Sequence, residues 1–189
     1  MGLFYHVSPK ELLKIRNEIF ITEGIPALKK NGFDRAPFSE SLFGRNNLGD
    51  FTYELCRLNT DSVLDFLQAH IAKGDNWIQI YLNVFKLHPH LESLVQLKNI
   101  NGMQFRLRPN SETKMRLRMD DFKGMPLFRT VEHKIKTYYT QKGLQKRINE
   151  LAKLINSDLS NINSFKKRWH ELHEPMKTDW EGRNVNKDE

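Results

Sequence analysis

The sequence predicts an α+β domain: a mostly antiparallel sheet with packed helices and a C-terminal helical hairpin. Two segments, FTYELCRL at 51–58 and WIQIYLNVFKL at 77–87, are rich in the β-branched and aromatic residues of strands. Helical stripes of apolar residues occur near both ends of the chain. Of 189 residues, 39% are hydrophobic, which suffices for a core. Strands interleaved with isolated helices favour α+β over a doubly wound sheet.

The N-terminal segment predicts a short strand followed by a helix. Residues 4–7 (FYHV) have strand composition, and Ser8 with Pro9 is the N-cap and first-turn pattern of a helix. The apolar face of that helix comprises Leu12, Leu13, Ile15 and Ile19. Gly24 to Pro26 should end it. Residues 31–50, rich in Gly, Asn, Ser and Pro, are typical of a structured loop.

The middle of the chain predicts strand, helix and strand. Residues 51–58 form the first strand, and 60–73 show apolar residues at helical spacing, with Gly74 as the stop. In 77–87 one face should be core: Ile78, Ile80, Leu82 and Val84. The other face carries Trp77, Gln79, Tyr81, Asn83 and Phe85. Amides mixed with aromatics are found both in binding clefts and on sheets packed against polar loops.

The C-terminal part predicts two helices and a tail. A helix is expected over 131–155, with the stripe Leu144, Ile148, Leu151 and Ile155. A second one carries Leu159, Ile162, Phe165, Trp169 and Leu172 and ends before Pro175. Together they should form the helical hairpin. We expect one domain over residues 1–175, and a polar, frayed tail over 176–189.

QFRLRPNSETKMRLRM, residues 104–119, alternates apolar and basic side chains around a turn-forming centre. The alternation predicts a hairpin with one basic face: Arg106, Arg108, Lys114, Arg116 and Arg118. Such a face fits a phosphate or nucleic-acid site. It equally fits a solvated outer face whose charges protect a sheet edge from aggregation.

The net charge of +7 comes entirely from residues 101–189, since residues 1–100 hold equal numbers of acidic and basic side chains. A localised positive field attracts nucleic acid or an acidic protein surface. Further cations on the predicted C-terminal helices are Lys142, Lys146, Arg147, Lys153 and 166–168. They either extend the hairpin surface or form the ordinary solvent side of amphipathic helices.

Several function classes are not indicated. No apolar run approaches the roughly 20 residues of a membrane span, so we expect a soluble, cytoplasmic protein. Cys56 is the only cysteine, which excludes an intrachain disulfide and a cysteine-rich metal site, and we expect it to be buried. Phosphate-loop, dinucleotide-fingerprint and zinc-protease motifs do not occur in the sequence. We therefore predict no metal site.

FYHVSPKELLKI followed by TEGIPAL, together residues 4–28, resembles the opening of ADP-ribosyltransferase-fold proteins. The resemblance is to the group that includes the RNA 2′-phosphotransferases and the DNA-modifying transferases. It implies NAD as cofactor. In this family a histidine at the end of the first strand holds the adenosine-side ribose, an aromatic residue stacks on nicotinamide, and a glutamate binds the nicotinamide ribose.

Carried over by position, the resemblance assigns His6 to the ribose and Glu112 to the nicotinamide ribose, with Gln104 or Glu92 as competitors. Tyr53 is the first choice for the stacking aromatic and Tyr81 the second, and Arg116 would contact the pyrophosphate. The implied function is NAD-dependent ADP-ribosyl transfer to a protein or nucleic-acid target. The alternative is a non-enzymatic binding or inhibitor module that uses its basic surface to bind nucleic acid or an acidic protein.

Overall fold

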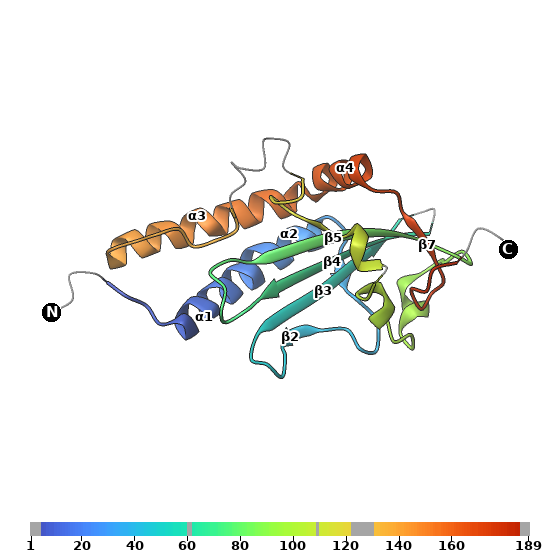
Figure 1. Ribbon diagram of the computed structural model, residues 1–189, viewed down its shortest axis with the longest axis horizontal. Coiled ribbons are helices and arrows are strands. Elements are labelled where there is room, and N and C mark those ends of the chain that lie inside the picture. Colours follow the sequence, from blue (N-terminus) through green and yellow to red (C-terminus); the bar gives the residue numbers. More distant parts are fainter. Residues whose placement is uncertain (1–4, 60–61, 109, 122–130, 186–189) are drawn as a thin grey trace.

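The computed structural model describes residues 5–59, 62–108, 110–121 and 131–185. Figure 1 shows its arrangement. The helices are α1 Pro9–Ile19, the π-helical turn η1 Phe20–Gly24, α2 Ile25–Lys30, the 3-10 turns η2 Leu94–Leu97, η3 Met103–Phe105 and η4 Asn110–Thr113, α3 Gln141–Ser160 and α4 Ile162–Leu172. The strands are β1 Asp34–Arg35, β2 Phe43–Arg45, β3 Phe51–Leu58, β4 Val63–Ile71, β5 Gln79–Leu87, β6 Met115–Arg116 and β7 Met176–Thr178.

The sheet has the order β1-β3-β4-β5-β6, with β2 also on β3 and β7 on β5. All pairs are antiparallel except β5 with β7. The predicted α+β class is therefore confirmed. Strand 51–58 has the predicted bounds, and strand 77–87 is confirmed from Gln79 onwards.

The helix predicted over 60–73 is wrong, because Val63–Ile71 is strand β4. Residues 60 and 61 lie outside the described part of the chain. β4 lies between β3 and β5 and is buried on both faces, so its apolar residues do not alternate with polar ones. Without that alternation, the apolar spacing in this segment imitates a helix.

The sheet separates two cores. On one face Leu55, Leu67 and Leu82 are in register and join the core beneath the helices. On the other face Cys56 and Phe66 join a smaller core. Figure 1 shows α1, α2 and α3 gathered on one side, and η2 to η4 near β7 at one end of the sheet. The two-faced pattern predicted for strand 77–87 is confirmed, since Ile80, Leu82 and Val84 belong to the helix-side core.

The first helix begins as predicted. Ser8 caps α1 through a complete capping box with Glu11. Gly24 and Pro26 do not stop the helix, contrary to the prediction. The π-helical turn η1 carries the chain into α2, where Pro26 occupies the first turn and no intrahelical N–H is required of it. Gly24 is needed for packing, since a Cβ there would lie 2.8 Å from Phe20 and 3.1 Å from Leu159.

The strand predicted over 4–7 is not formed by its described residues, Tyr5 to Val7; Phe4 lies outside the described part. Tyr5 instead donates one backbone hydrogen bond, 3.0 Å long, to Tyr139 O. A single bond of this kind fixes the segment next to the start of α3 without making it a strand of the sheet.

Both C-terminal helices are confirmed, with corrected bounds, and Leu159, predicted on the second helix, belongs to α3. α3 begins at Gln141, not at 131, and residues 131–140 form an irregular segment with bends and one bridge, from Lys134 to Trp77. Thr140 caps α3 by accepting a hydrogen bond from Gly143 N. Asn161 separates α3 from α4, and the two helices follow one another in Figure 1. Trp169 of α4 is fully buried, and its Nε1 donates to Thr113 O at 2.7 Å.

The tail predicted to be frayed is ordered over residues 176–185, while residues 186–189 lie outside the described part. Met176–Thr178 forms β7 beside β5, and Thr178 is fully buried. Trp180 Nε1 donates to Pro89 O at 2.8 Å. These long-range contacts hold the tail on the sheet.

Candidate functional site: a basic face on helix α3

The hairpin predicted over 104–119 is wrong. Its described residues, all but Pro109, form the turns η3 and η4 and the two-residue strand β6. Asn83 Nδ2 of β5 donates to the carbonyl of Asn110, a buried residue of this segment, at 2.6 Å. A polar side chain of β5 thus holds η4 against the sheet, and the segment turns where the alternation predicted an extended strand.

The five cations of that segment do not share one face. Arg106 Nε lies 2.9 Å from Glu54 Oε1, and Arg106 Nη2 donates to Glu40 O. Lys114 Nζ donates to Arg106 O at 3.2 Å. Glu54 is on the face of β3 opposite the helices, since it lies between Tyr53 and Leu55 of the helix-side core.

Burial dominates the electrostatics around Glu54. Burial raises the pKa of the Glu54 carboxyl. Hydrogen bonds from Leu42 N and Gln68 and the charges of Arg106 and Lys114 lower it, but by less. Burial also lowers the pKa of the Lys114 ammonium, partly offset by Glu54. These groups satisfy one another in the interior and are not arranged as a free anion site.

The other cations of the segment go elsewhere. Arg118 binds Asp158 of α3 with two hydrogen bonds, of 2.9 and 2.6 Å. Arg116 stacks on Trp77, with its guanidinium carbon 4.8 Å from the ring centroid. Arg108 is exposed. Residues 104–119 therefore mainly hold neighbouring elements of the fold together.

The residues assigned to NAD by resemblance do not converge on one face. Tyr53 is in register with Ala69, and Ala69 with Ile80, so Tyr53 shares the helix-side face with Ile80 while Tyr81 points to the opposite face. Tyr53 OH donates to Asn17 of α1 at 2.6 Å. Its burial raises the pKa of the Tyr53 hydroxyl.

The remaining assigned residues lie at separate places. His6 is exposed ahead of α1, and Glu112 is exposed on η4. Tyr81 and Arg116 are brought together, since they are paired across β5 and β6. Of the residues assigned to the cofactor, these two alone are neighbours in the part of the chain that the structure describes.

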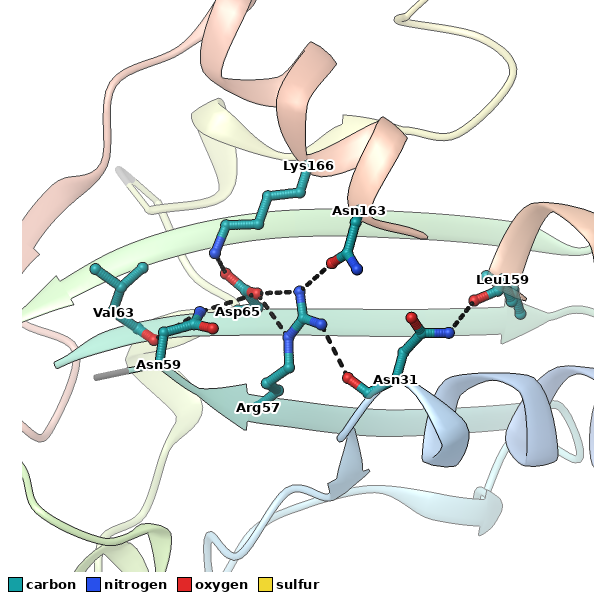
Figure 2. A network of polar contacts seen from close by, with 8 residues as sticks. All are labelled: Asn31, Arg57, Asn59, Val63, Asp65, Leu159, Asn163 and Lys166. Carbon is teal, nitrogen blue, oxygen red and sulfur yellow. Dashed lines mark hydrogen bonds and ion pairs between the residues drawn. The ribbon is translucent and has the colours of Figure 1, made fainter. Parts of the chain in front are cut away.

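Of the three cations predicted on α4, Lys166 and Arg168 have carboxylate partners and Lys167 is exposed. Lys166 Nζ lies 2.7 Å from the buried Asp65 Oδ1, and Arg168 pairs with Glu171 at 2.7 Å. Figure 2 shows the network around Asp65, which also binds Arg57 and Asn59. Because Lys166 and Arg168 have carboxylate partners, α4 offers less unpaired positive charge than α3.

Helix α3 keeps its cations on the outside. Leu144, Leu151 and Ile155 are buried against the core, and Lys142, Lys146 and Lys153 are exposed on the opposite side. At 100° per residue the three lysines lie within an arc of about 40° and span about 16 Å along the axis. An open hollow runs along the same stripe, lined by Lys142, Gln145, Lys146, Asn149, Glu150 and Lys153.

The irregular segment 131–140 before α3 adds to this surface. Arg147 Nε donates to Thr137 O at 3.3 Å, which holds the segment alongside the helix. Exposed Lys136 lies on it. The hydrogen bond from Arg147, followed by the charges of Arg147, Lys146 and Lys136, lowers the pKa of Glu150. Lys136 is not among the cations predicted from the sequence; the alternating KIKTYYT at 134–140 is the signal that could have indicated it.

We call this surface the α3 basic face: Lys136, Lys142, Gln145, Lys146, Arg147, Asn149, Glu150 and Lys153. Its five cations face one acid, Glu150, which pairs with Arg147 at 2.8 Å. Within the described residues Lys136, Lys142, Lys146 and Lys153 have no ion-pair partner within 4.0 Å. A surface of this composition can bind a chain of negative charges.

Other site types find little support in the described residues. They hold no cluster of three or more His, Cys, Asp or Glu side chains that could bind a metal. The described helices also include none with the length and apolar character needed to cross a bilayer. No family model, curated protein sequence or solved structure matches the chain.

Proposed function

We propose that this protein is a binding module that binds nucleic acid through the α3 basic face. The observation that carries the proposal is the alignment of Lys142, Lys146 and Lys153 on one exposed arc without carboxylate partners in the described structure. Lysines that neutralise phosphates release condensed counterions, and this release drives sequence-independent binding.

The composition between the lysines favours nucleic acid over an acidic protein. Gln145 and Asn149 lie on the same stripe and are joined by a hydrogen bond of 3.1 Å. Amides contact both phosphates and base edges. The stripe is about 16 Å long, which is enough to lie against several successive phosphates of a strand. A regular polyanion can meet every lysine of the stripe at once.

NAD-dependent transfer, implied by the N-terminal resemblance, is the competing proposal. It requires His6, an aromatic residue and a glutamate around one NAD molecule. The first-choice aromatic, Tyr53, is buried and bonded to Asn17 beneath α1, and the second choice, Tyr81, faces away from it. The binding module needs no such rearrangement and is therefore better supported.

The test is binding of a fluorescent oligonucleotide, measured by anisotropy against salt concentration. We expect a dissociation constant in the micromolar range at low salt, and an affinity that falls steeply as salt rises. Replacing Lys142, Lys146 and Lys153 together by Gln should reduce the slope of log K against log[salt] by about 2 to 3.

A matched control distinguishes the loss of this particular site from a general loss of positive charge. Lys30, Lys86 and Lys98 are exposed on other elements, so their triple Gln variant carries the same charge change. This control should keep the wild-type slope. Equal losses in the two triple variants, or equally tight binding of polyglutamate, would refute the proposed nucleic-acid site. Titration with NAD beside His6→Ala tests the competing proposal directly.

A further inference from the structure

Four polar side chains form one row across the sheet, on the face opposite the helices. Glu54 of β3 is in register with Gln68 of β4. Gln68 is in register with Tyr81 of β5, and Tyr81 with Arg116 of β6. In-register residues on neighbouring antiparallel strands point to the same face of a sheet. Because Glu54 points away from the helices, the whole row does so too.

This row lies beside the smaller core but is not covered by it. The adjacent row on the same face consists of Cys56, Phe66 and Asn83, and all three are buried. Phe66 and Cys56 belong to the smaller core, and η2 to η4 lie at that end of the sheet (Figure 1). In the next row only Glu54 is fully buried, and its three partners are partly exposed. A ligand can therefore reach these three side chains.

Arg116 is the cation of this row, and it lacks a counter-charge. Its guanidinium carbon lies 4.8 Å from the centroid of the Trp77 ring, which fixes its position. Among the described residues its side chain has no ion-pair partner within 4.0 Å, and its Nε is buried without a hydrogen-bond partner. Asp120 accepts a hydrogen bond from the backbone N of Arg116, not from the guanidinium. The planar N–H groups of arginine match a carboxylate or a phosphate.

Beside Arg116 the row presents acceptor oxygens. Tyr81 OH donates to Gln79 Oε1 at 2.7 Å, so the Tyr81 oxygen remains available as an acceptor. Gln68 Nε2 donates to Glu54 Oε1 at 3.0 Å, which leaves the Gln68 carbonyl oxygen as a second acceptor. Gln68 and Arg116 are two strand spacings apart, about 10 Å. A ligand that uses the whole row thus carries an oxyanion at one end and hydrogen-bond donors along the rest.

We propose that this row binds a small hydroxylated anion of the sugar phosphate class, with its phosphate on Arg116 and its hydroxyls on Tyr81 and Gln68. Inorganic phosphate would use only the guanidinium, and a neutral sugar only the two oxygens. The site lies on the face of the sheet opposite the helices, so it is separate from the α3 basic face. It does not depend on nucleic-acid binding.

NMR titration of the ¹⁵N-labelled protein at constant ionic strength tests the proposal with three probes: glucose 6-phosphate, inorganic phosphate and glucose. We expect glucose 6-phosphate to shift the Arg116 Nε–H and Trp77 Nε1–H signals with saturation. It should bind at least about fivefold more tightly than inorganic phosphate, through its extra hydrogen bonds, and more tightly than glucose. Arg116→Gln should weaken its binding at least about tenfold.

Two further variants make the test specific. Tyr81→Phe keeps the ring, so it should preserve the fold and the affinity for inorganic phosphate but reduce the advantage of glucose 6-phosphate. Arg35→Gln is the matched control, because Arg35 also lies over an aromatic ring, 5.4 Å from the centroid of Phe43, but outside the row. It should bind glucose 6-phosphate as the wild type does.

The proposal is refuted if glucose 6-phosphate gives no saturable shift at Arg116, or if Arg35→Gln weakens binding as much as Arg116→Gln. Inorganic phosphate that binds as tightly as glucose 6-phosphate would also refute it, since the hydroxyls would then contribute nothing. The triple Gln variant of Lys142, Lys146 and Lys153 should keep wild-type affinity for glucose 6-phosphate. Either site can thus fail its test while the other stands.

Discussion

Asp65 Oδ1 lies 2.7 Å from Lys166 Nζ, so the central strand β4 is joined to helix α4 through the interior of the protein. Asp65 is fully buried, and its other oxygen accepts two hydrogen bonds from Arg57, of 3.0 and 2.7 Å. One carboxylate therefore balances two cations whose side chains are only 13% and 19% exposed. Three elements, β3, β4 and α4, depend on it (Figure 2).

Asp65→Asn should lower the free energy of unfolding by about 3 to 5 kcal/mol, because it leaves Arg57 and Lys166 without their counter-charge in the interior. Urea denaturation followed by circular dichroism measures the loss. Asp34→Asn is the matched control, since the Asp34 side chain is 75% exposed and lies 4.0 Å from Lys29. We expect it to change stability by less than about 1 kcal/mol. Similar losses in both variants would contradict the role assigned to Asp65.

Gly102→Ala should destabilise the smaller core. Gly102 has φ of +76°, and a Cβ there would lie 2.2 Å from Cγ of Phe38. The ring of Phe38 is stacked on Phe105 at 5.0 Å, so it cannot move without disturbing the core. We expect a loss of more than about 2 kcal/mol. Gly74→Ala, where a Cβ meets nothing within 4 Å, should be nearly neutral in the same denaturation experiment.

The sequence predicted those elements that follow local rules. Ser8, Pro9 and Glu11 form the N-cap, first turn and capping box of α1 without help from distant residues. Strand β3 has the composition and bounds expected. β4 was not predicted as a strand, because its position between two neighbours buries both faces. Burial on two faces depends on the order of strands in the sheet, which is a property of the whole chain.

The basic segment 104–119 failed as a prediction for a related reason. Alternating residues point to two opposite faces only if the chain is extended. The residues that hold this segment in turns lie far away in the sequence. Glu54 pairs with Arg106, and Asn83 bonds to the Asn110 carbonyl. Conversely, helical spacing predicts the lysine stripe of α3. It does not place Lys136 on the same surface, because the spacing extends the predicted helix back to residue 131 and the structure begins it at Gln141.

Cys56 should serve as a probe of global unfolding. Its thiol is fully buried, and burial raises the pKa of Cys56 to about 12, so both access and thiolate are lacking in the folded protein. As the only cysteine, it gives a single signal. Iodoacetamide labelling followed by mass spectrometry should be slow in buffer and fast in concentrated urea, and faster for Asp65→Asn than for wild type. Rapid labelling in buffer that urea does not change would contradict the packing around β3.

Asp158 should make the free energy of unfolding depend on pH in the acid range. Burial alone would raise its pKa, but hydrogen bonds from His133 and Arg118 and their charges outweigh it, so the pKa of Asp158 is lowered. A carboxyl whose folded pKa lies below its unfolded pKa, about 3.9, stabilises the fold above that pH and loses this contribution as pH falls. Asp158→Asn should therefore cost about 3 kcal/mol at pH 7 and clearly less near pH 3.

Denaturation of the wild type and Asp158→Asn at pH 7, 5 and 3 measures this difference. Asp179→Asn is a suitable control, because the Asp179 side chain is 32% exposed and its ion pair with Arg183 is 4.0 Å long. The control should show little difference from wild type that depends on pH. If the loss in Asp158→Asn stays the same from pH 7 to pH 3, Asp158 acts by hydrogen-bond geometry alone, and its charge does not hold Arg118 and His133 against α3.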